Sequence, residues 1–249
     1  MEKTNEKDLT STLNFTISSA ETDMFARLRL GAAVNYLIQS ASDSADRLGF
    51  GYGGIRRQNL FWVLSRLTLE IYRPLKWHEV IEVETWPKSI ERILYLRDFI
   101  LRDSERAVTG RATSGWLAVD LGSKRIKKIE GIEADSFTYL KNKHALAESP
   151  AKLHPVDGGE EIEIRAGYFD IDLNGHVTTT RYVDWMMDTF DPEFHKDKFP
   201  RKLSLNLMKE TMPGEVIRLT RKAGDAGKFE FEGRNLNSSA SAFRANIEF

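Results

Sequence analysis

The sequence predicts an α+β protein built from two tandem repeats, each an antiparallel sheet wrapped around one long helix. Three observations carry this prediction: an internal repeat, two amphipathic helical segments, and a run of strand-like segments after each helix. Each half has the order short strand, helix, several strands. A run of strands after a single helix is typical of an antiparallel sheet in an α+β domain.

The internal repeat relates residues 67–83 (LTLEIYRPLKWHEVIEV) to residues 203–219 (LSLNLMKETMPGEVIRL), which align without gaps. We interpret each segment as a hairpin, with two strands joined by a turn. The segments that lead into them, residues 23–36 and 172–185, match in order but only weakly in identity. Self-similarity of this kind indicates a duplicated structural unit.

Helical periodicity predicts one helix in each half. Apolar residues recur at i, i+3, i+4 and i+7 over residues 30–48, and Gly49 follows as a residue that can end the helix. A second helix is predicted over residues 178–190, with Thr178 as its N-cap and Trp185 on its core face.

Segments rich in β-branched and aromatic residues, bounded by turn signals, predict the strands. Residues 148–161 carry two prolines and two glycines, the composition of a linker. The predicted division is a first domain at residues 1–147, the linker at 148–161 and a second domain at 162–249. The predicted strands are residues 60–73, 79–86, 92–102, 106–119, 202–209, 215–221, 228–233 and 240–249.

Composition excludes several classes of protein. The formal net charge of the 249 residues is −1, so no global basic field favours nucleic acid. No apolar run approaches the roughly 20 residues that span a bilayer. There is no cysteine, which excludes disulfides, thiolate metal ligands and a cysteine nucleophile, and the histidines show no metal-binding spacing. Residues 1–12 do not resemble a signal or transit peptide, so a cytoplasmic location is expected.

The densest polar segment is residues 170–177, DIDLNGHV, just before the second helix. Asp172, Asn174 and His176 alternate, so in an extended chain they would point to one side. A helix N-terminus nearby can stabilise an oxyanion, and an imidazole exchanges protons near neutral pH. The alternative is structural, because the same residue types form turns and caps.

The repeat favours the chemical interpretation of this segment. The counterparts of Asp172, Asn174 and His176 in the first half are Asp23, Phe25 and Arg27. A capping device that the fold needs should recur in both halves, and this polar set does not. We therefore expect one half to carry the site and the other to hold the substrate.

At this segment the chain resembles the plant and bacterial acyl-acyl carrier protein thioesterases, whose signature resembles D-x-D-x-N-x-H-V-N-N-x-K-Y-x-x-W. Residues 59–67, NLFWVLSRL, also resemble that family's N-L-x-W-V-x-x-R-x segment. Arg181 replaces the Lys of the signature and Thr178-Thr179 replace its Asn pair. The matching residues are Asp170, Asp172, Asn174, His176, Val177, Tyr182 and Trp185.

The resemblance implies two tandem hotdog domains, with acyl-chain binding mainly in the first and catalysis in the second. It implies a fatty acyl-acyl carrier protein as substrate and partner, a free fatty acid as product, no cofactor, and a homodimer in many members. The family's Glu-Cys pair falls on Glu210 and Thr211 here. A thiolate nucleophile is thus excluded, and no neighbouring feature would activate Thr211 in its place.

The expected catalytic residues are Asp172, Asn174, His176 and Glu210. Glu210 and Asn174 would position and activate water, while His176, oriented by Asp172, would polarise the carbonyl or protonate the leaving thiolate. The expected acyl-binding residues are Val34, Leu37, Ile38, Trp62 and Leu64.

Three alternative functions remain open: an acyl-CoA thioesterase, a non-catalytic acyl-binding hotdog protein and a hotdog dehydratase. The four polar residues together favour an enzyme over a binding module. Basic residues at 56–57, 124–128 and 201–202 could dock an acidic carrier protein, or could simply be solvated surface.

Overall fold

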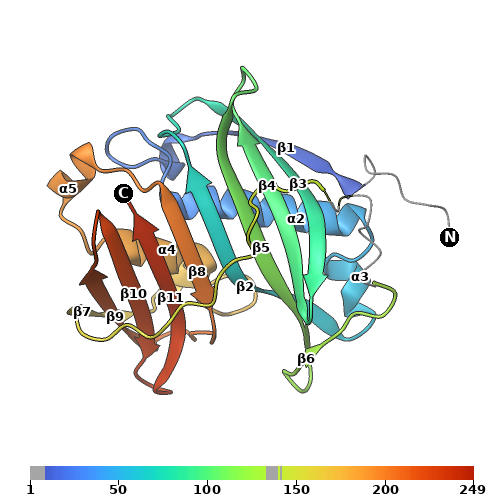
Figure 1. Cartoon of the computed structure of the whole chain (residues 1–249). Helices are drawn as coiled ribbons and strands as arrows, with labels where there is room; N and C mark the ends of the chain where they lie inside the picture. The colour runs from blue at the N-terminus through green and yellow to red at the C-terminus, as the bar shows by residue number, and fades with distance from the viewer. Residues whose placement is uncertain (1–8, 133–139, 141) are drawn as a thin grey trace.

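The computed structural model describes residues 9–132, 140 and 142–249, which form one continuous antiparallel sheet with helices against one face (Figure 1). The first half contains β1 (Ser11–Thr16), α2 (Leu30–Arg47), α3 (Tyr52–Arg56), β2 (Leu60–Ile71), β3 (Val80–Glu91), β4 (Leu94–Arg102), β5 (Val108–Asp120) and β6 (Ile126–Lys127). The second contains β7 (Glu160–Arg165), α4 (Thr179–Met187), α5 (Pro192–Asp197), β8 (Lys202–Leu207), β9 (Val216–Ala223), β10 (Lys228–Asn235) and β11 (Ala240–Glu248).

The order of the strands confirms the repeat. The sheet reads β1-β3-β4-β5-β2-β8-β11-β10-β9-β7, so the second half mirrors the first, and β2 and β8 meet in the middle. Across this joint Thr68 pairs with Ser204, which is also its partner in the sequence alignment, and Leu67 pairs with Leu205. An approximate two-fold axis therefore passes beside Thr68 and Ser204.

The predicted hairpins are wrong, although the segments occupy equivalent positions in the two halves. β2 pairs with β5 and β8, whereas β3 pairs with β1 and β4. Both edges of β2 are paired, with β5 on one side and β8 on the other, so β3 cannot pair with β2. β3 lies two strands away, beyond β5 and β4. β8 and β9 are separated in the same way by β11 and β10.

The first helix ends as predicted. Gly49 has φ +82°, its N–H donates to Asp46 O at 3.1 Å, and the N–H of Phe50 donates to Ala45 O at 3.1 Å. These two bonds form a Schellman motif, which satisfies the last carbonyls of α2. The chain therefore leaves the helix at a defined angle.

The second helix is shorter than predicted. Thr178 is the N-cap residue but its side chain makes no capping hydrogen bond, and α4 stops at Met187. Pro192, which disfavours helical backbone at the residue before it, starts α5 close by. Phe190 lies outside α4 and stacks on Phe194 at 4.5 Å.

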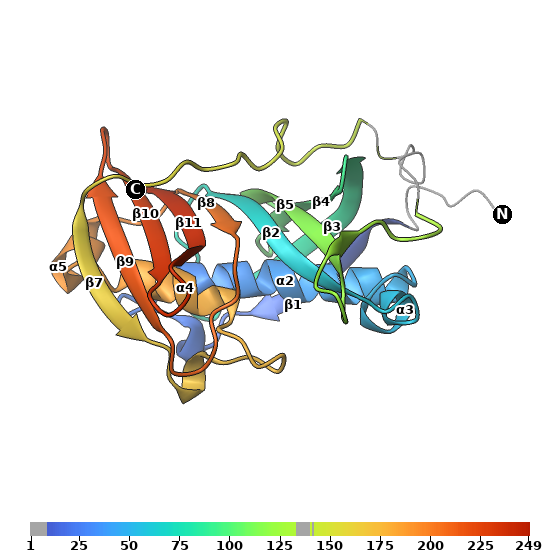
Figure 2. The ribbon, with the colours of Figure 1, turned by 90° about the horizontal axis from the view of Figure 1, so that it is seen from below.

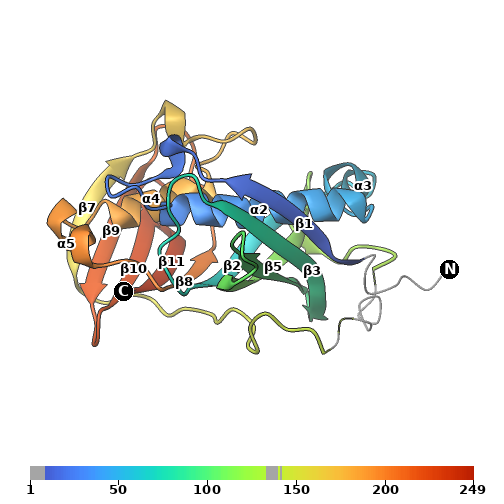
Figure 3. The same ribbon diagram turned by 90° about the horizontal axis from the view of Figure 1, so that it is seen from above.

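One hydrophobic core joins the two halves. Figures 2 and 3 show α2 and α4 against the same face of the sheet. Buried residues of both helices and of the inward faces of the strands form one cluster, in which Leu67 and Leu203 are 2% and 0% exposed. No described helix is long and apolar enough to cross a membrane.

A segment between the halves crosses the opposite face of the sheet (Figure 2). Asn206 on β8 fastens it from both sides, since its Nδ2 donates to Ala151 O at 2.9 Å and its Oδ1 accepts from Leu153 N at 2.8 Å. β7 begins at Glu160, so the last two residues of the predicted linker belong to a strand. The domain boundaries at 147 and 162 stay a prediction.

Candidate active site

The polar segment before α4 forms a tight turn. The Asp172 N–H donates to His176 O at 2.8 Å, and the Gly175 N–H donates to Asp172 O at 3.0 Å. The carboxylate Oδ1 of Asp172 accepts from the N–H of Asn174 at 2.8 Å and of His176 at 3.3 Å. The expectation of an extended segment is wrong, because the aspartate side chain closes the turn on the main chain.

The first half contains the same turn. Asp23 Oδ1 accepts from the N–H of Phe25 and of Arg27, both at 2.9 Å, and the Asp23 N–H donates to Arg27 O at 2.7 Å. Ala26 has φ +58° where Gly175 has φ +85°. The aspartate thus recurs in both halves with the same contacts, and in both it supports the main chain of the turn.

Arg27 occupies the position that corresponds to His176, and its guanidinium makes hydrogen bonds and ring contacts within the chain. It donates to Asp23 Oδ2 at 2.9 Å through Nε and to the carbonyl of His195 at 2.6 Å through NH2. Its guanidinium also lies 4.7 Å from the Phe25 ring centre and 5.8 Å from that of Phe199. At this position the first half therefore has a salt bridge between Arg27 and Asp23.

His176 instead faces an acidic residue from another element. Its Nε2 lies 3.2 Å from Glu210 Oε2, and the two side chains are 22% and 44% exposed. The next residue, Thr211, fixes this arrangement, since its carbonyl accepts from the Val177 N–H at 2.9 Å. Two predicted site residues far apart in sequence are thus brought together at the N-terminus of α4.

The main-chain contact that corresponds to Val177 and Thr211 lies between apolar residues in the first half. The Leu28 N–H donates to Leu75 O at 2.7 Å, in the place of the bond between Val177 and Thr211. Pro74 and Leu75 stand where the second half has Glu210 and Thr211. The backbone joint recurs while the titratable side chains do not, so these side chains are not needed by the fold.

Asp170 and Arg181 have a role that sequence reasoning did not assign. Arg181 Nε donates to Asp170 Oδ1 at 2.7 Å, and Asp170 Oδ2 accepts from the Gly167 N–H at 2.7 Å. The carbonyl of Asp170 accepts from the Thr178 N–H at 2.9 Å. This ion pair holds the turn against the start of α4. The signal was the spacing of an acid and a base around the predicted helix start.

Asn174 is the most open member of the polar set. Its side chain is exposed, and its Nδ2 reaches Asp172 Oδ2 at a long 3.5 Å. The amide is therefore available to a ligand.

The five predicted acyl-binding residues lie in different surroundings. Val34 and Leu37 are buried in the main core, and Ile38 packs against it. Trp62 belongs to another cluster, where it meets Tyr95 edge-on at 5.1 Å. Leu64 on β2 is 7% exposed. Two cavities in the described part of the chain are lined by other residues.

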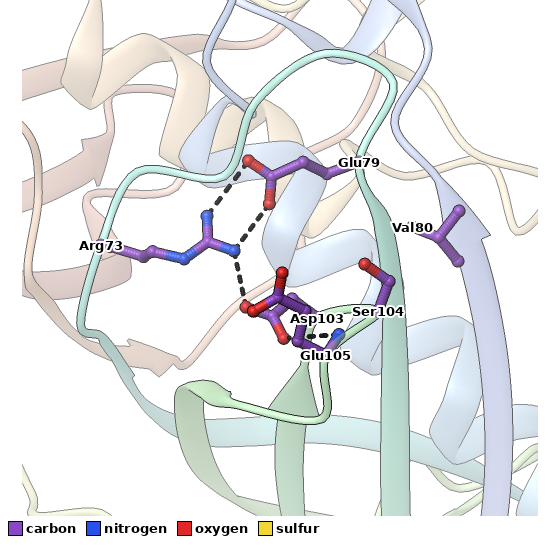
Figure 4. A pocket seen from close by; sticks show the side chains of 6 residues that line it. All are labelled: Arg73, Glu79, Val80, Asp103, Ser104 and Glu105. Atoms are coloured by element: carbon purple, nitrogen blue, oxygen red, sulfur yellow. Dashed lines mark hydrogen bonds and ion pairs between the residues drawn. The ribbon is translucent and has the colours of Figure 1, made fainter.

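The larger of those cavities is a charged surface feature of the first half (Figure 4). Arg73 there bridges Glu79 at 2.8 Å and Asp103 at 2.9 Å. Glu79 also accepts from the Lys76 N–H, as Glu215 does from the Met212 N–H in the second half. The charged groups pair with one another, and the main-chain bond to Glu79 recurs at Glu215, so we interpret the cavity as part of the scaffold.

The arrangement near α4 has the parts of an acid-base site. A carboxylate and an imidazole in contact can take up and return a proton. The neighbouring helix N-terminus favours negative charge, and an exposed amide can bind a water or a carbonyl oxygen. The fold is that of a double hotdog protein, and its second half brings His176 and Glu210 into contact.

Comparisons with known proteins agree with this class. The family model for the acyl-ACP thioesterase N-terminal domain matches residues 8–134, and that for the C-terminal domain matches residues 153–249. The chain belongs to the acyl-ACP thioesterase family.

Solved structures and relatives extend the match. An acyl-ACP thioesterase from Bacteroides thetaiotaomicron superposes with a TM-score of 0.90 and 26% identity, covering 98% of this chain and 99% of that one. The fold of the 12:0-ACP thioesterase from Umbellularia californica is also similar, with a TM-score of 0.80 and 20% identity over 96% of each chain. The Arabidopsis thaliana oleoyl-acyl carrier protein thioesterase 1 is 27% identical over 82% of this chain, which spans 61% of that relative's length.

Proposed function

We propose that this chain hydrolyses the thioester of fatty acyl-acyl carrier protein and releases a free fatty acid. The contact of 3.2 Å between His176 and Glu210 carries the proposal, since it supplies an acid-base pair only in the second half. Family membership over residues 8–134 and 153–249 supports this substrate class.

In the proposed reaction, water adds to the thioester carbonyl carbon. The pair formed by Glu210 and His176 accepts a proton from the water as the C–O bond forms. The C–S bond then breaks, and the pair returns the proton to the thiolate sulfur. Asn174 and the N-terminus of α4 stabilise the negative charge on the carbonyl oxygen. A positioned acid or base contributes about 10²–10⁴-fold to the rate.

Asp172 acts in this scheme through the main chain. Its carboxylate holds the N–H groups of Asn174 and His176, so it positions both side chains without touching the imidazole ring. Thr211 is not needed as a nucleophile, because its side chain is buried and 0% exposed.

The first half is proposed to bind the acyl chain between α2 and the sheet, near Val34, Leu37 and Ile38. Two of the basic candidates for carrier docking are engaged within the chain, since Lys202 pairs with Glu70 at 3.0 Å and Lys127 lies 3.9 Å from Asp120. A homodimer and a cytoplasmic location are further parts of the proposal.

The test compares carrier and CoA thioesters that bear the same acyl chain. We expect thiol release from the acyl carrier protein at a kcat/KM at least tenfold above that for the acyl-CoA, and loss of release in His176→Ala and Glu210→Ala. Equal or better turnover of acyl-CoA would make the chain an acyl-CoA thioesterase. Tight binding of acyl thioesters without release would make it an acyl-binding protein.

A further inference from the structure

Two buried hydroxyl groups beside the site have no partner at full hydrogen-bond geometry among the described residues. The side chains of Tyr182 and Thr211 are 3% and 0% exposed, and neither Tyr182 Oη nor Thr211 Oγ1 makes a hydrogen bond of full geometry. Buried polar groups without a partner are rare, and each one needs an explanation. The two hydroxyls come from separate elements, α4 and the segment after β8.

The two groups are neighbours, since the Val177 N–H just before α4 donates to Thr211 O at 2.9 Å and Tyr182 lies on α4. Burial raises the pKa of Tyr182 to about 12, weak hydrogen bonds with the side chain and main chain of Thr211 act to lower it, and the charge of Glu210 acts to raise it. The Tyr182 hydroxyl is thus neutral at physiological pH and can donate a proton to an acceptor. It lies beside Thr211, so a small shift would bring the two into hydrogen-bond geometry.

The fold itself does not require these hydroxyls. The equivalent positions in the first half are Ala33 and Leu75, both 1% exposed. That half makes the same backbone joint with apolar side chains. The hydroxyl pair therefore occurs only where the acid-base pair occurs, and it lies on the buried side of it, since the Glu210 side chain is 44% exposed and Thr211 is 0% exposed.

We propose that the Tyr182 hydroxyl donates to Thr211 Oγ1 in the working enzyme, and that this bond holds Glu210 against His176. Tyr182 is a positioning residue, and Thr211 is its acceptor. Residue 211 has two anchors, this bond and the main-chain bond to Val177, so the preceding carboxylate has little freedom. This inference rests on the proposed function for its kinetic part alone.

The test uses Tyr182→Phe and Thr211→Val, which remove one hydroxyl each with little change of shape, together with the double variant. Each single variant should lower kcat about tenfold with KM changed less than about twofold, because misplaced catalytic groups slow the chemical step. The double variant should be no slower than the singles, since both remove one bond. Thr211→Ser, which keeps the hydroxyl, should have a kcat close to that of the wild type, unlike Thr211→Val.

Amide hydrogen exchange supplies a readout that does not depend on turnover. The Val177 N–H, bonded to Thr211 O, should exchange faster in both single variants, while the equivalent Leu28 N–H, bonded to Leu75 O, should not change. Thr109→Val is the matched control. It also removes a buried hydroxyl without a partner among the described residues, but on β5 in the first half, so kcat should stay at the wild-type value.

Multiplicative losses in the double variant, or unchanged kcat and Val177 exchange in the single variants, would overturn the inference. Failure of Thr211→Ser to restore turnover would also overturn it. If the wild type cleaves no acyl thioester, the proposed function fails, and unchanged Val177 exchange would then be the result that overturns the positioning role.

Discussion

Asp23 and Asp172 make the same contacts in the two halves. Comparing the halves residue by residue therefore distinguishes side chains that stabilise the fold from side chains that are candidates for catalysis. Each aspartate accepts two main-chain N–H groups of its own turn. Their neighbours diverge, with Arg27 closed into a salt bridge and His176 open to Glu210. A residue that recurs supports the fold, and a polar residue present in one half is a candidate for function.

The two aspartates should respond alike in stability and differently in activity. Asp23→Ala and Asp172→Ala should each lower the free energy of unfolding by about 1–2 kcal/mol, because main-chain donors lose their acceptor. Only Asp172→Ala should also lower kcat. Urea unfolding and thioester hydrolysis on the same preparations check this, and equal kcat losses in both variants would contradict it.

The chemical residues should show the reverse pattern. Asn174→Ala, His176→Ala and Glu210→Ala should lower kcat by about 10²-fold or more with little change in melting temperature, because they stabilise charge in the transition state. Trp185→Ala should cost about 3–5 kcal/mol of stability instead, since it truncates an aromatic side chain that is 4% exposed. If the polar variants melt early while folded enzyme keeps full turnover, the cluster is only a structural turn.

Tyr182 should make stability depend on alkaline pH. Burial raises its pKa to about 12, above the unfolded value near 10. The neutral hydroxyl thus contributes stability that is fully present below pH 10 and is lost as pH rises through about 12, roughly 2 kcal/mol in all. Unfolding free energies from pH 9 to 12 should fall more steeply for the wild type than for Tyr182→Phe. Parallel curves would contradict the shift.

At the scale of the elements, the two turns before the helices carry different residues at the same left-handed position. Gly175 and Ala26 both adopt positive φ, at +85° and +58°, a region that costs residues other than glycine energy. A Cβ at Gly175 would meet no atom within 4 Å, so backbone strain alone decides the effect of a substitution.

This comparison predicts opposite effects of two substitutions. Ala26→Gly should raise the free energy of unfolding by about 0.5–1 kcal/mol, and Gly175→Ala should lower it by a similar amount. Chemical denaturation of the two variants measures both. A stabilising Gly175→Ala would show that the positive φ is not maintained in solution.

The sequence predicts where the helices and strands lie better than it predicts which strands pair with one another. Period-two patterns and turn residues located eight strands to within a few residues, and the stripe on α2 located that helix. Strand pairing was missed, because similarity between residues 67–83 and 203–219 shows that the segments are equivalent but not which strands flank them. Alternation alone does not reveal that the Asp172 carboxylate accepts hydrogen bonds from its own main chain, so it does not predict the site turn. The sequence also does not show that Val34 and Trp62 lie in different clusters, because that depends on packing.

The whole molecule is held together by its central strands. β2 and β8 pair edge to edge from Arg66↔Asn206 to Glu70↔Lys202, and the main core takes residues from both helices. Neither half closes its own sheet, so each alone would expose a strand edge and an apolar helix face.

The halves should therefore fold only together. Fragments 1–147 and 148–249, expressed separately, should lack a cooperative melting transition, and the mixture should recover one along with hydrolytic activity. Circular dichroism and size-exclusion chromatography test this, with the intact chain as reference. Cooperative melting of either fragment alone would show that the halves are independent domains.

The joint between β2 and β8 also bears on how such a molecule can change over generations. In a symmetric pair of separate chains, one codon change alters both copies, so a substitution that closes one turn also closes the other. Once the copies share a single gene, each position mutates alone. Arg27 can then close one turn with a salt bridge while His176 contacts Glu210 at the other, and selection can act on rigidity and on chemistry at equivalent positions of the same protein.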